Sequence, residues 1–173
     1  MTALGVREYA EFRCIFSNHS GDESEGGATM PELTMEQAIE AATQLKARIG
    51  GQTGDAYQQL ETALQVFKDD GYPLESIIPQ GEDAKLGFSL KSADARTFFE
   101  IYGKLIRKSL CTPHGEFSKL IKKGLDTSVG AVLTAIVTTL GIPLAALGVI
   151  IPVAVIITNT GLQAFCEFTA PKK

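Results

Sequence analysis

The feature that most constrains the fold is a run of 40 residues without a charged side chain, residues 127–166 of the 173-residue sequence. Val, Ile, Leu, Ala and Gly dominate this run, whereas charged residues are frequent in the part of the chain that precedes it. A helix that is apolar on every side is stable only when lipid or a large protein core surrounds it. The sequence therefore predicts either a membrane-inserting segment or a core that the rest of the chain must cover.

A Gly-Ile-Pro turn at residues 141–143 divides the run into two arms, because proline is favoured in the first turn of a new helix. The first arm, residues 127–140, has 14 residues. Its helical length of about 21 Å is short for a full membrane span. The second arm, residues 143–165, has 23 residues, and its length of about 35 Å is sufficient. We therefore expect a hydrophobic helical hairpin within residues 126–168, followed by a basic tail at 169–173.

The second arm favours membrane insertion, but only moderately. The 12 Leu, Ile, Val and Phe residues from Ile142 to Phe165 contribute roughly 4–7 kcal/mol toward insertion. Pro152, Asn159 and Gln163 reduce this free energy gain. A moderate gain is what a protein that exists both in water and in a membrane requires. The side chains expected to enter the membrane are Val129, Val132, Leu133, Ile136, Leu140, Leu144, Leu147, Val149, Ile150, Ile151, Val153, Val155, Ile156 and Ile157.

Small residues and lysines accompany the two arms. Small residues at helix-contact spacing let helices or protomers approach closely, and the expected packing positions are Gly130, Thr134, Gly141, Ala145 and Gly148. A cation beside anionic lipid gains about 1 kcal/mol. If both arms insert, the positive-inside tendency places both ends in the cytosol. The expected lipid-contacting residues are Lys119, Lys122, Lys123, Lys172 and Lys173.

Charge is distributed unevenly along the chain. Residues 1–100 carry 8 basic and 17 acidic side chains, a net charge of −9, whereas residues 101–173 carry 8 and 3, a net charge of +5. The basic residues cluster beside the apolar run, and no nucleic-acid-binding motif accompanies them. The expected partners are therefore a lipid membrane and either further copies of the chain or a larger protein, and not nucleic acid.

The N-terminus and the cysteines indicate the compartment. Residues 1–14 lack the basic region and the uninterrupted apolar stretch of a signal peptide, which predicts a cytoplasmic or inner (plasma) membrane location. Cys14, Cys111 and Cys166 are odd in number and widely spaced, which is typical of a reducing compartment. We expect each cysteine to be a buried, small apolar side chain.

Residues 1–125 predict a regulatory or interaction domain that is mainly α-helical, with α+β as the alternative. Gly, Ser and acidic residues at 18–32 predict an exposed acidic loop. Strand-like alternation at 9–17 and 86–90 predicts a short two-stranded element. Helical periodicity predicts helices over about 34–48, 53–68, 92–110 and 116–125, the first opened by a capping box of Thr34 and Gln37.

Catalytic chemistry is poorly supported. Cys111 and His114 have a CxxH spacing, but no second ligand pair completes a metal site and no third group orients a nucleophile. His19, Ser20 and Asp22 are neighbours in the acidic loop, and adjacency in sequence does not create a triad. We expect no enzymatic activity, no metal and no cofactor.

Two hypotheses of function remain. The leading one is a membrane-inserting or membrane-anchored protein that oligomerises and perturbs the bilayer, by architectural analogy with pore-forming toxins that bury a hydrophobic hairpin. The acidic N-terminal part would cover the apolar part until it is released. The alternative is a soluble interaction subunit, in which the apolar hairpin is the core or an obligate interface with another chain. A buried strand in the Val/Ile-rich part is disfavoured by Pro152.

Overall fold

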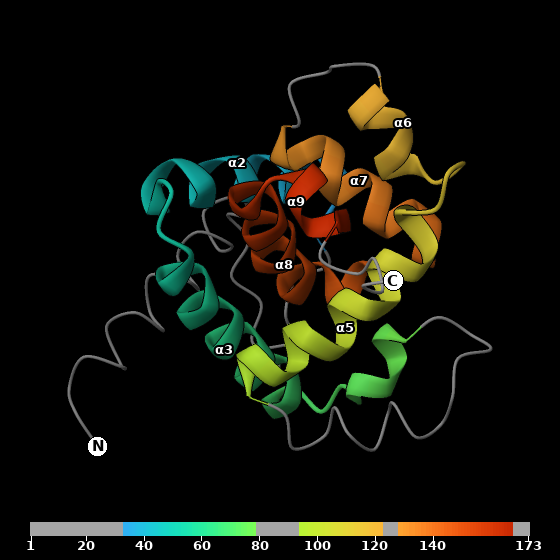
Figure 1. The fold of residues 1–173 in the computed structure, drawn as a ribbon. Helices are drawn as coiled ribbons and strands as arrows, with labels where there is room; N and C mark the ends of the chain where they lie inside the picture. Colours follow the sequence, from blue (N-terminus) through green and yellow to red (C-terminus); the bar gives the residue numbers. More distant parts are fainter. Residues whose placement is uncertain (1–32, 79–93, 123–127, 168–173) are drawn as a thin grey trace.

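The computed structural model describes residues 33–78, 94–122 and 128–167 of the chain. Within these ranges the protein is a bundle of helices and contains no strand (Figure 1). In chain order the elements are α2 (Met35–Ile49), α3 (Thr53–Asp69), the 3-10 turn η1 (Leu74–Ile77), α5 (Ala95–Leu110), α6 (Glu116–Lys122), α7 (Val129–Leu140), the 3-10 turn η2 (Leu144–Ala146), α8 (Leu147–Thr160) and α9 (Leu162–Glu167). The mainly α-helical class is confirmed. The acidic loop and both segments of the expected two-stranded element lie outside the described residues.

Local signals define the outer helices, and α2 is the clearest case. The Thr34 hydroxyl accepts a hydrogen bond from the Gln37 backbone N–H at 3.3 Å, and the Gln37 side chain accepts one from the Thr34 N–H at 2.9 Å. This is the expected capping box. Gly50 ends the helix with φ of 61°, a conformation that L side chains rarely adopt. The buried stripe of the helix consists of Ala38, Ala42, Leu45 and Ile49.

The start of α5 differs slightly from the sequence prediction. Its N-cap is Asp94, whose carboxylate accepts a hydrogen bond from the Thr97 N–H at 2.8 Å. At its centre the Tyr102 hydroxyl donates a hydrogen bond to the Ile77 carbonyl at 3.1 Å and so holds η1 against the helix. Burial of Tyr102 raises the pKa of its phenol above the usual range. The polar end of this large side chain is therefore satisfied inside the bundle.

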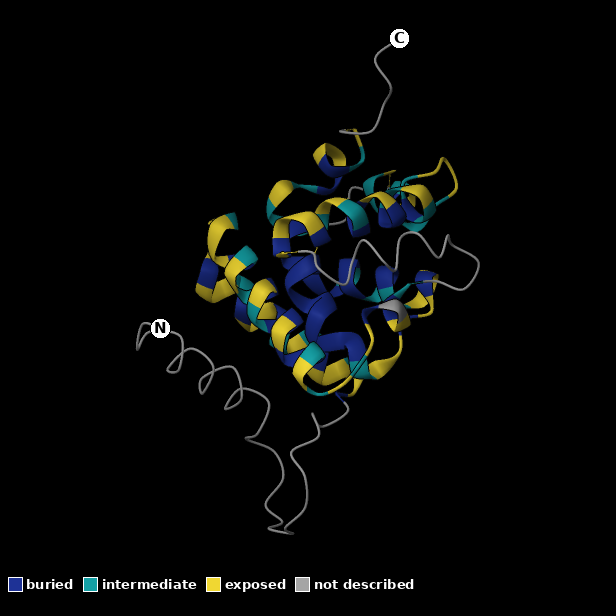
Figure 2. Ribbon diagram, turned by 90° about the horizontal axis from the view of Figure 1, so that it is seen from below, coloured by how far each residue is buried: buried dark blue, intermediate teal, exposed yellow. Residues whose placement is uncertain are grey.

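Helix α8 occupies the centre of the bundle. Every residue from Leu147 to Ile157 is buried, and α2, α3, α7 and α9 all pack against it. In Figure 2 the buried ribbon fills the interior, whereas exposed residues line the outer helices. Helices from the N-terminal and C-terminal parts of the chain thus contribute to one hydrophobic core. Within the described residues, protein covers the apolar run.

The hairpin turns where the sequence predicts, but its second arm is shorter than expected. Gly141, in the left-handed conformation with φ of 63°, ends α7. The expected continuous helix over 143–165 is wrong: a 3-10 turn precedes α8, and Gly161 with φ of 87° separates α8 from α9. With 14 residues, α8 is about 21 Å long. Among the described residues, no helix combines the length and the apolar character that a membrane crossing needs.

Candidate functional site

The candidate site is the hydrophobic hairpin of α7, η2 and α8, together with the helices that cover it. With one exception, the side chains expected to enter a membrane are buried in the core. The exception is Leu144, which is 46% exposed and lies just after the turn between the two arms. Among the described residues it is the sole large hydrophobic side chain that is so exposed. The uncharged tip of the hairpin therefore faces outward, while its arms face inward.

Apolar packing holds the hairpin in place, with few directional contacts. In the part of the chain that the structure describes, no polar or charged residue is buried in the core. The hydroxyls of Thr138, Thr158 and Thr160 each donate to a carbonyl four residues earlier in the same helix, at 2.6–2.8 Å. These groups are satisfied within their own helices, whatever surrounds those helices. Asn159, near the end of α8, donates to the Gly50 carbonyl after α2 at 3.1 Å.

The expected packing positions lie in different environments. Gly130 on α7 lies against α2: a Cβ added to it would come within 2.8 Å of the Ile39 Cγ2 atom, so a larger residue would force Ile39 to shift. Gly148 is buried within α8, whereas Thr134 and Ala145 are half-buried. Gly141 belongs to the turn and is exposed. Gly130 therefore lies at a close approach between α7 and α2.

The expected lipid-contacting lysines are placed only in part. Lys119 and Lys122 are exposed on α6. The Lys119 ammonium forms an ion pair with the Glu116 carboxylate at 2.6 Å, and Lys122 donates to the Pro113 carbonyl at 3.3 Å. Exposed pairs of this kind contribute only about 0.2–1 kcal/mol, so the Lys119 side chain exchanges partners readily. Lys123, Lys172 and Lys173 lie outside the described residues.

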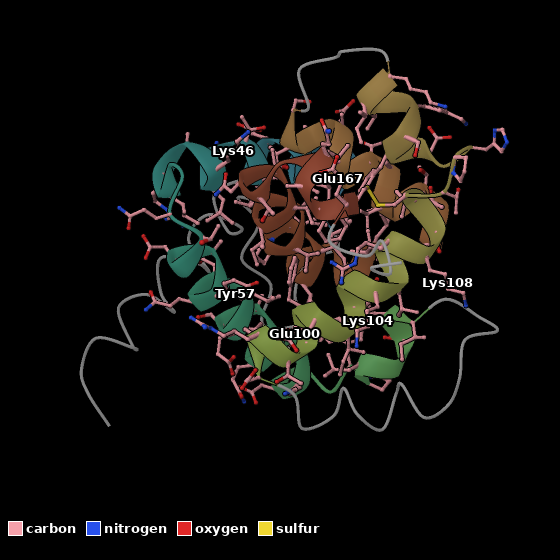
Figure 3. The ribbon with its side chains drawn as sticks, in the orientation of Figure 1. Lys46, Tyr57, Glu100, Lys104, Lys108 and Glu167 are labelled. Atoms are coloured by element: carbon pink, nitrogen blue, oxygen red, sulfur yellow. A yellow bond between two sulfur atoms is a disulfide. The ribbon has the colours of Figure 1, made fainter. Side chains whose placement is uncertain are left out.

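The cysteines depart from the sequence prediction. Cys111, at the C-terminal end of α5, and Cys166, in α9, are joined by a disulfide with a Cα–Cα distance of 5.5 Å (Figure 3). Both residues are half-buried. The expectation of separate, buried thiols is therefore wrong for this pair, because two residues 55 positions apart are brought together by the fold. Cys14 lies outside the described residues.

Next to the disulfide, Phe165 of α9 connects three helices. Its ring lies 6.2 Å from the Phe99 ring of α5 and 6.3 Å from the Phe117 ring of α6, centroid to centroid. The Arg107 guanidinium lies 4.8 Å from its centroid, a cation–π distance. Partial burial lowers the pKa of Arg107. The sequence patterns did not predict this cluster, and its one signal was the presence of Cys111 and Cys166, whose pairing their spacing does not fix.

The described residues hold no arrangement suited to catalysis at the CxxH sequence. Cys111 is held in the disulfide and so has no free thiolate to attack a substrate or bind a metal. His114 is exposed in the turn before α6. Within the described ranges, no group of three His, Cys, Asp or Glu side chains is placed to hold a metal ion.

Charged side chains lie on the outer surface of the bundle. On α5, Glu100, Lys104 and Lys108 follow one another at four-residue spacing on the exposed side of the helix (Figure 3).

Comparison of the chain with protein-family models, with curated proteins and with solved structures gives no match. Its function is therefore inferred from the chemistry of the buried hairpin itself.

Proposed function

We propose that the protein is a conditional membrane-inserting effector, whose described bundle is the closed form. In the open form the covering helices move away and the hairpin enters and perturbs a bilayer. The observation that carries this proposal is α8, which is apolar on every side and buried along Leu147 to Ile157 without a single charged neighbour in its own arm. Lipid and protein core are the two environments that suit such a helix.

The hydrogen bonding of the hairpin supports its transfer to lipid. In a bilayer, every polar group that has no internal partner costs several kcal/mol. The hydroxyls of Thr138, Thr158 and Thr160 keep their backbone partners in any environment, because donor and acceptor belong to the same helix. Among the described hydrogen bonds of the hairpin's side chains, that of Asn159 to the Gly50 carbonyl is the one lost on opening. Opening the bundle therefore breaks mainly apolar contacts, which lipid chains replace.

The helix lengths define how the open form would span. Helix α8 alone is too short, but an α-helix that also takes in η2 would run from Pro143 to Thr160 and contain 18 residues. Its length of about 27 Å falls at the lower end of what spans a bilayer, and proline is favoured at its first turn. Helix α7, with 12 residues, reaches only about 18 Å. The open form would thus have one spanning helix, with α7 at the membrane surface.

A single tryptophan at the hairpin tip tests the proposal. The sequence contains no Trp, and Leu144 is exposed, so Leu144→Trp places a unique fluorophore at the tip without disturbing the core. On vesicles of phosphatidylcholine with phosphatidylserine, at neutral or acidic pH, we expect a blue shift of its emission, quenching by brominated lipid and release of a trapped dye. Lys104→Trp, on the exposed side of α5, is the matched control and should remain in water.

The alternative function is an interaction module whose hairpin remains a core. Two observations favour it: the arms are covered by the chain's own helices, and no described helix is suited to cross a membrane. If Leu144→Trp and Lys104→Trp give the same emission with and without vesicles, and the dye stays inside, membrane insertion is wrong. The hairpin then serves to hold the outer helices in place, and their exposed faces become the candidate binding surfaces.

A further inference from the structure

We propose that the Cys111–Cys166 disulfide is a redox latch that holds α9 over the end of the hairpin, and that reduction by a dithiol opens this end of the bundle. The inference rests on the proposed function, since it names the step that begins to uncover the hairpin. It starts from the position of the bond, which joins the end of α5 to the helix that directly follows α8. No other disulfide occurs among the described residues.

Helix α9 depends on its attachments. It has six residues, and a helix of that length is not stable alone in water. The chain holds one end through Gly161, whose φ of 87° sets the bend after α8, and the disulfide holds the other end at Cys166. After reduction, α9 is held by packing and by the chain connection at Gly161, a residue whose wide conformational range suits a hinge.

Phe165 is the contact that the latch keeps in place. Phe165 is 2% exposed, and its ring lies among Phe99, Phe117 and Arg107. The ring also lies close to the backbone of α5, because a Cβ added at Gly103 would lie 3.7 Å from it, an ordinary van der Waals distance. The disulfide begins at the next residue and keeps Phe165 at a high effective concentration near its site. Without that restraint, Phe165 and Leu162 hold α9 by packing alone.

Removing α9 would uncover α8. The two helices pack against each other, and α9 also contacts α6. Because α8 is apolar on all sides, each surface that α9 leaves becomes an exposed apolar surface. The latch would therefore control access to the C-terminal half of the buried arm, whereas α2 and α3 would still cover the remainder.

The reaction is an ordinary thiol–disulfide exchange. One thiolate of the dithiol attacks Cys111 or Cys166 and forms a mixed disulfide, and the other cysteine leaves as a thiolate that takes up a proton. The second thiol of the reductant then closes its own disulfide and releases the remaining cysteine. Two electrons and two protons pass from the dithiol to the protein. Both cysteines are half-buried and thus partly open to a small reductant.

Hydrogen exchange in the absence of lipid tests the latch directly. We compare the oxidised full chain, the chain in dithiothreitol and the variant Cys111→Ser with Cys166→Ser. Amide exchange in 162–167 and in the second half of α8 should rise at least tenfold on reduction, and the double variant should exchange fast with or without dithiothreitol. Exchange in α2 and α3 should rise less than exchange in α9, because α9 also opens locally. Cys14→Ser is the matched control, and it should respond to dithiothreitol as the unaltered chain does.

Three results would overturn the latch. The first is equal exchange of α9 in the oxidised and reduced chains. The second is an equal loss of protection from amide exchange in α2, α3 and α9, which would show that the bond stabilises the whole fold equally. The third is a peptide map of the oxidised protein without the fragment that links Cys111 to Cys166.

A dye-release assay on the same samples separates the two proposals. Faster exchange of α9 on reduction with intact vesicles supports the latch and contradicts membrane insertion. Dye release that is the same in the oxidised and reduced chains, together with unchanged exchange, supports insertion and overturns the latch. Release that increases only when α9 opens supports both.

Discussion

Helices α5 and α8 are similar in length, with 16 and 14 residues, but they owe their structure to different causes. Asp94 caps α5, one side of the helix is buried, and Lys104 and Lys108 lie on the other. By contrast, α8 begins without a side-chain cap, contains Pro152 and is buried on every side up to Ile157. Local signals specify α5, whereas the surroundings specify α8. Helix α8 is therefore the part of the bundle that suits either of two apolar environments, a protein core or lipid.

The largest effect should come from a charge placed in α8. Ile156→Lys puts an unpaired ammonium into the core, which should lower the free energy of unfolding by about 4 kcal/mol or more. Glu100→Lys, on the exposed side of α5, should change it by no more than about 0.5 kcal/mol. Urea unfolding followed by circular dichroism measures both. Equal values for the two variants would contradict the contrast between the helices.

Removing the disulfide should have the next largest effect, because it links the end of α5 to the helix after α8. The bond closes a loop with a sequence separation of 55 residues, so loop entropy predicts a loss of about 4 kcal/mol or somewhat less for Cys111→Ser with Cys166→Ser. Dithiothreitol should bring the unaltered chain to the same stability. Urea unfolding curves that do not change on reduction would contradict this contribution of loop entropy.

Two buried glycines should respond with opposite signs. At Gly130 a methyl group meets Ile39 at 2.8 Å, and overpacking of this kind typically costs about 1–3 kcal/mol. At Gly103 the nearest atom lies 3.7 Å away, so alanine should stabilise α5 by up to about 1 kcal/mol. Thermal unfolding of Gly130→Ala and Gly103→Ala tests this.

A double-mutant cycle sharpens the same comparison. Ile39→Ala removes the atom that Gly130→Ala would strike, so the two changes together should destabilise less than the sum of the separate changes, by about 0.5 kcal/mol or more. Strict additivity would mean that α2 and α7 do not approach each other at this position.

The smallest effect should be the pH dependence of the α5 cap. Hydrogen bonds from Thr97, the backbone bond first, lower the pKa of Asp94 below its usual value. The folded-state pKa is thus below the unfolded one, so the stabilisation is present above the unfolded pKa and is lost as pH falls through the folded pKa. Asp94→Asn, which can still cap, should lack this acid-dependent loss. Stability curves of both proteins that run parallel from neutral to acidic pH would contradict the cap.

Sequence patterns predicted the parts of the fold that depend on near neighbours. The capping box of Thr34 and Gln37 involves residues three apart, and the break at Gly141 reflects the backbone of one residue. The length of α8 was overestimated because hydropathy is continuous from residue 142 onward, whereas the 3-10 turn η2 and the bend at Gly161 depend on tertiary packing. Apolar content indicated burial, but it could not distinguish lipid from the helices of the same chain.

In the candidate site, the sequence indicated individual positions but not the residues that they contact. The spacing around Gly130 indicated a helix contact, but its partner Ile39 lies 91 positions earlier in the sequence and could be found only in the folded chain. Three cysteines allow three different pairings, and their spacing does not choose among them. Phe165 looked like one apolar residue among many, and only the arrangement of α5, α6 and α9 makes it the contact beside the disulfide.

The position of α8 in the chain also affects the synthesis of the protein. Helices α2, α3 and α7, which pack against α8, all precede it in the chain, and Thr160 follows Ile49 by 111 positions. Translation proceeds at about 5–20 residues per second, so α8 is synthesised on the order of ten seconds after α2. During that interval the apolar sides of the earlier helices have no α8 to pack against. Translation that stops before α8 would release a product prone to aggregation, and chaperones that hold apolar segments would be needed most at this stage.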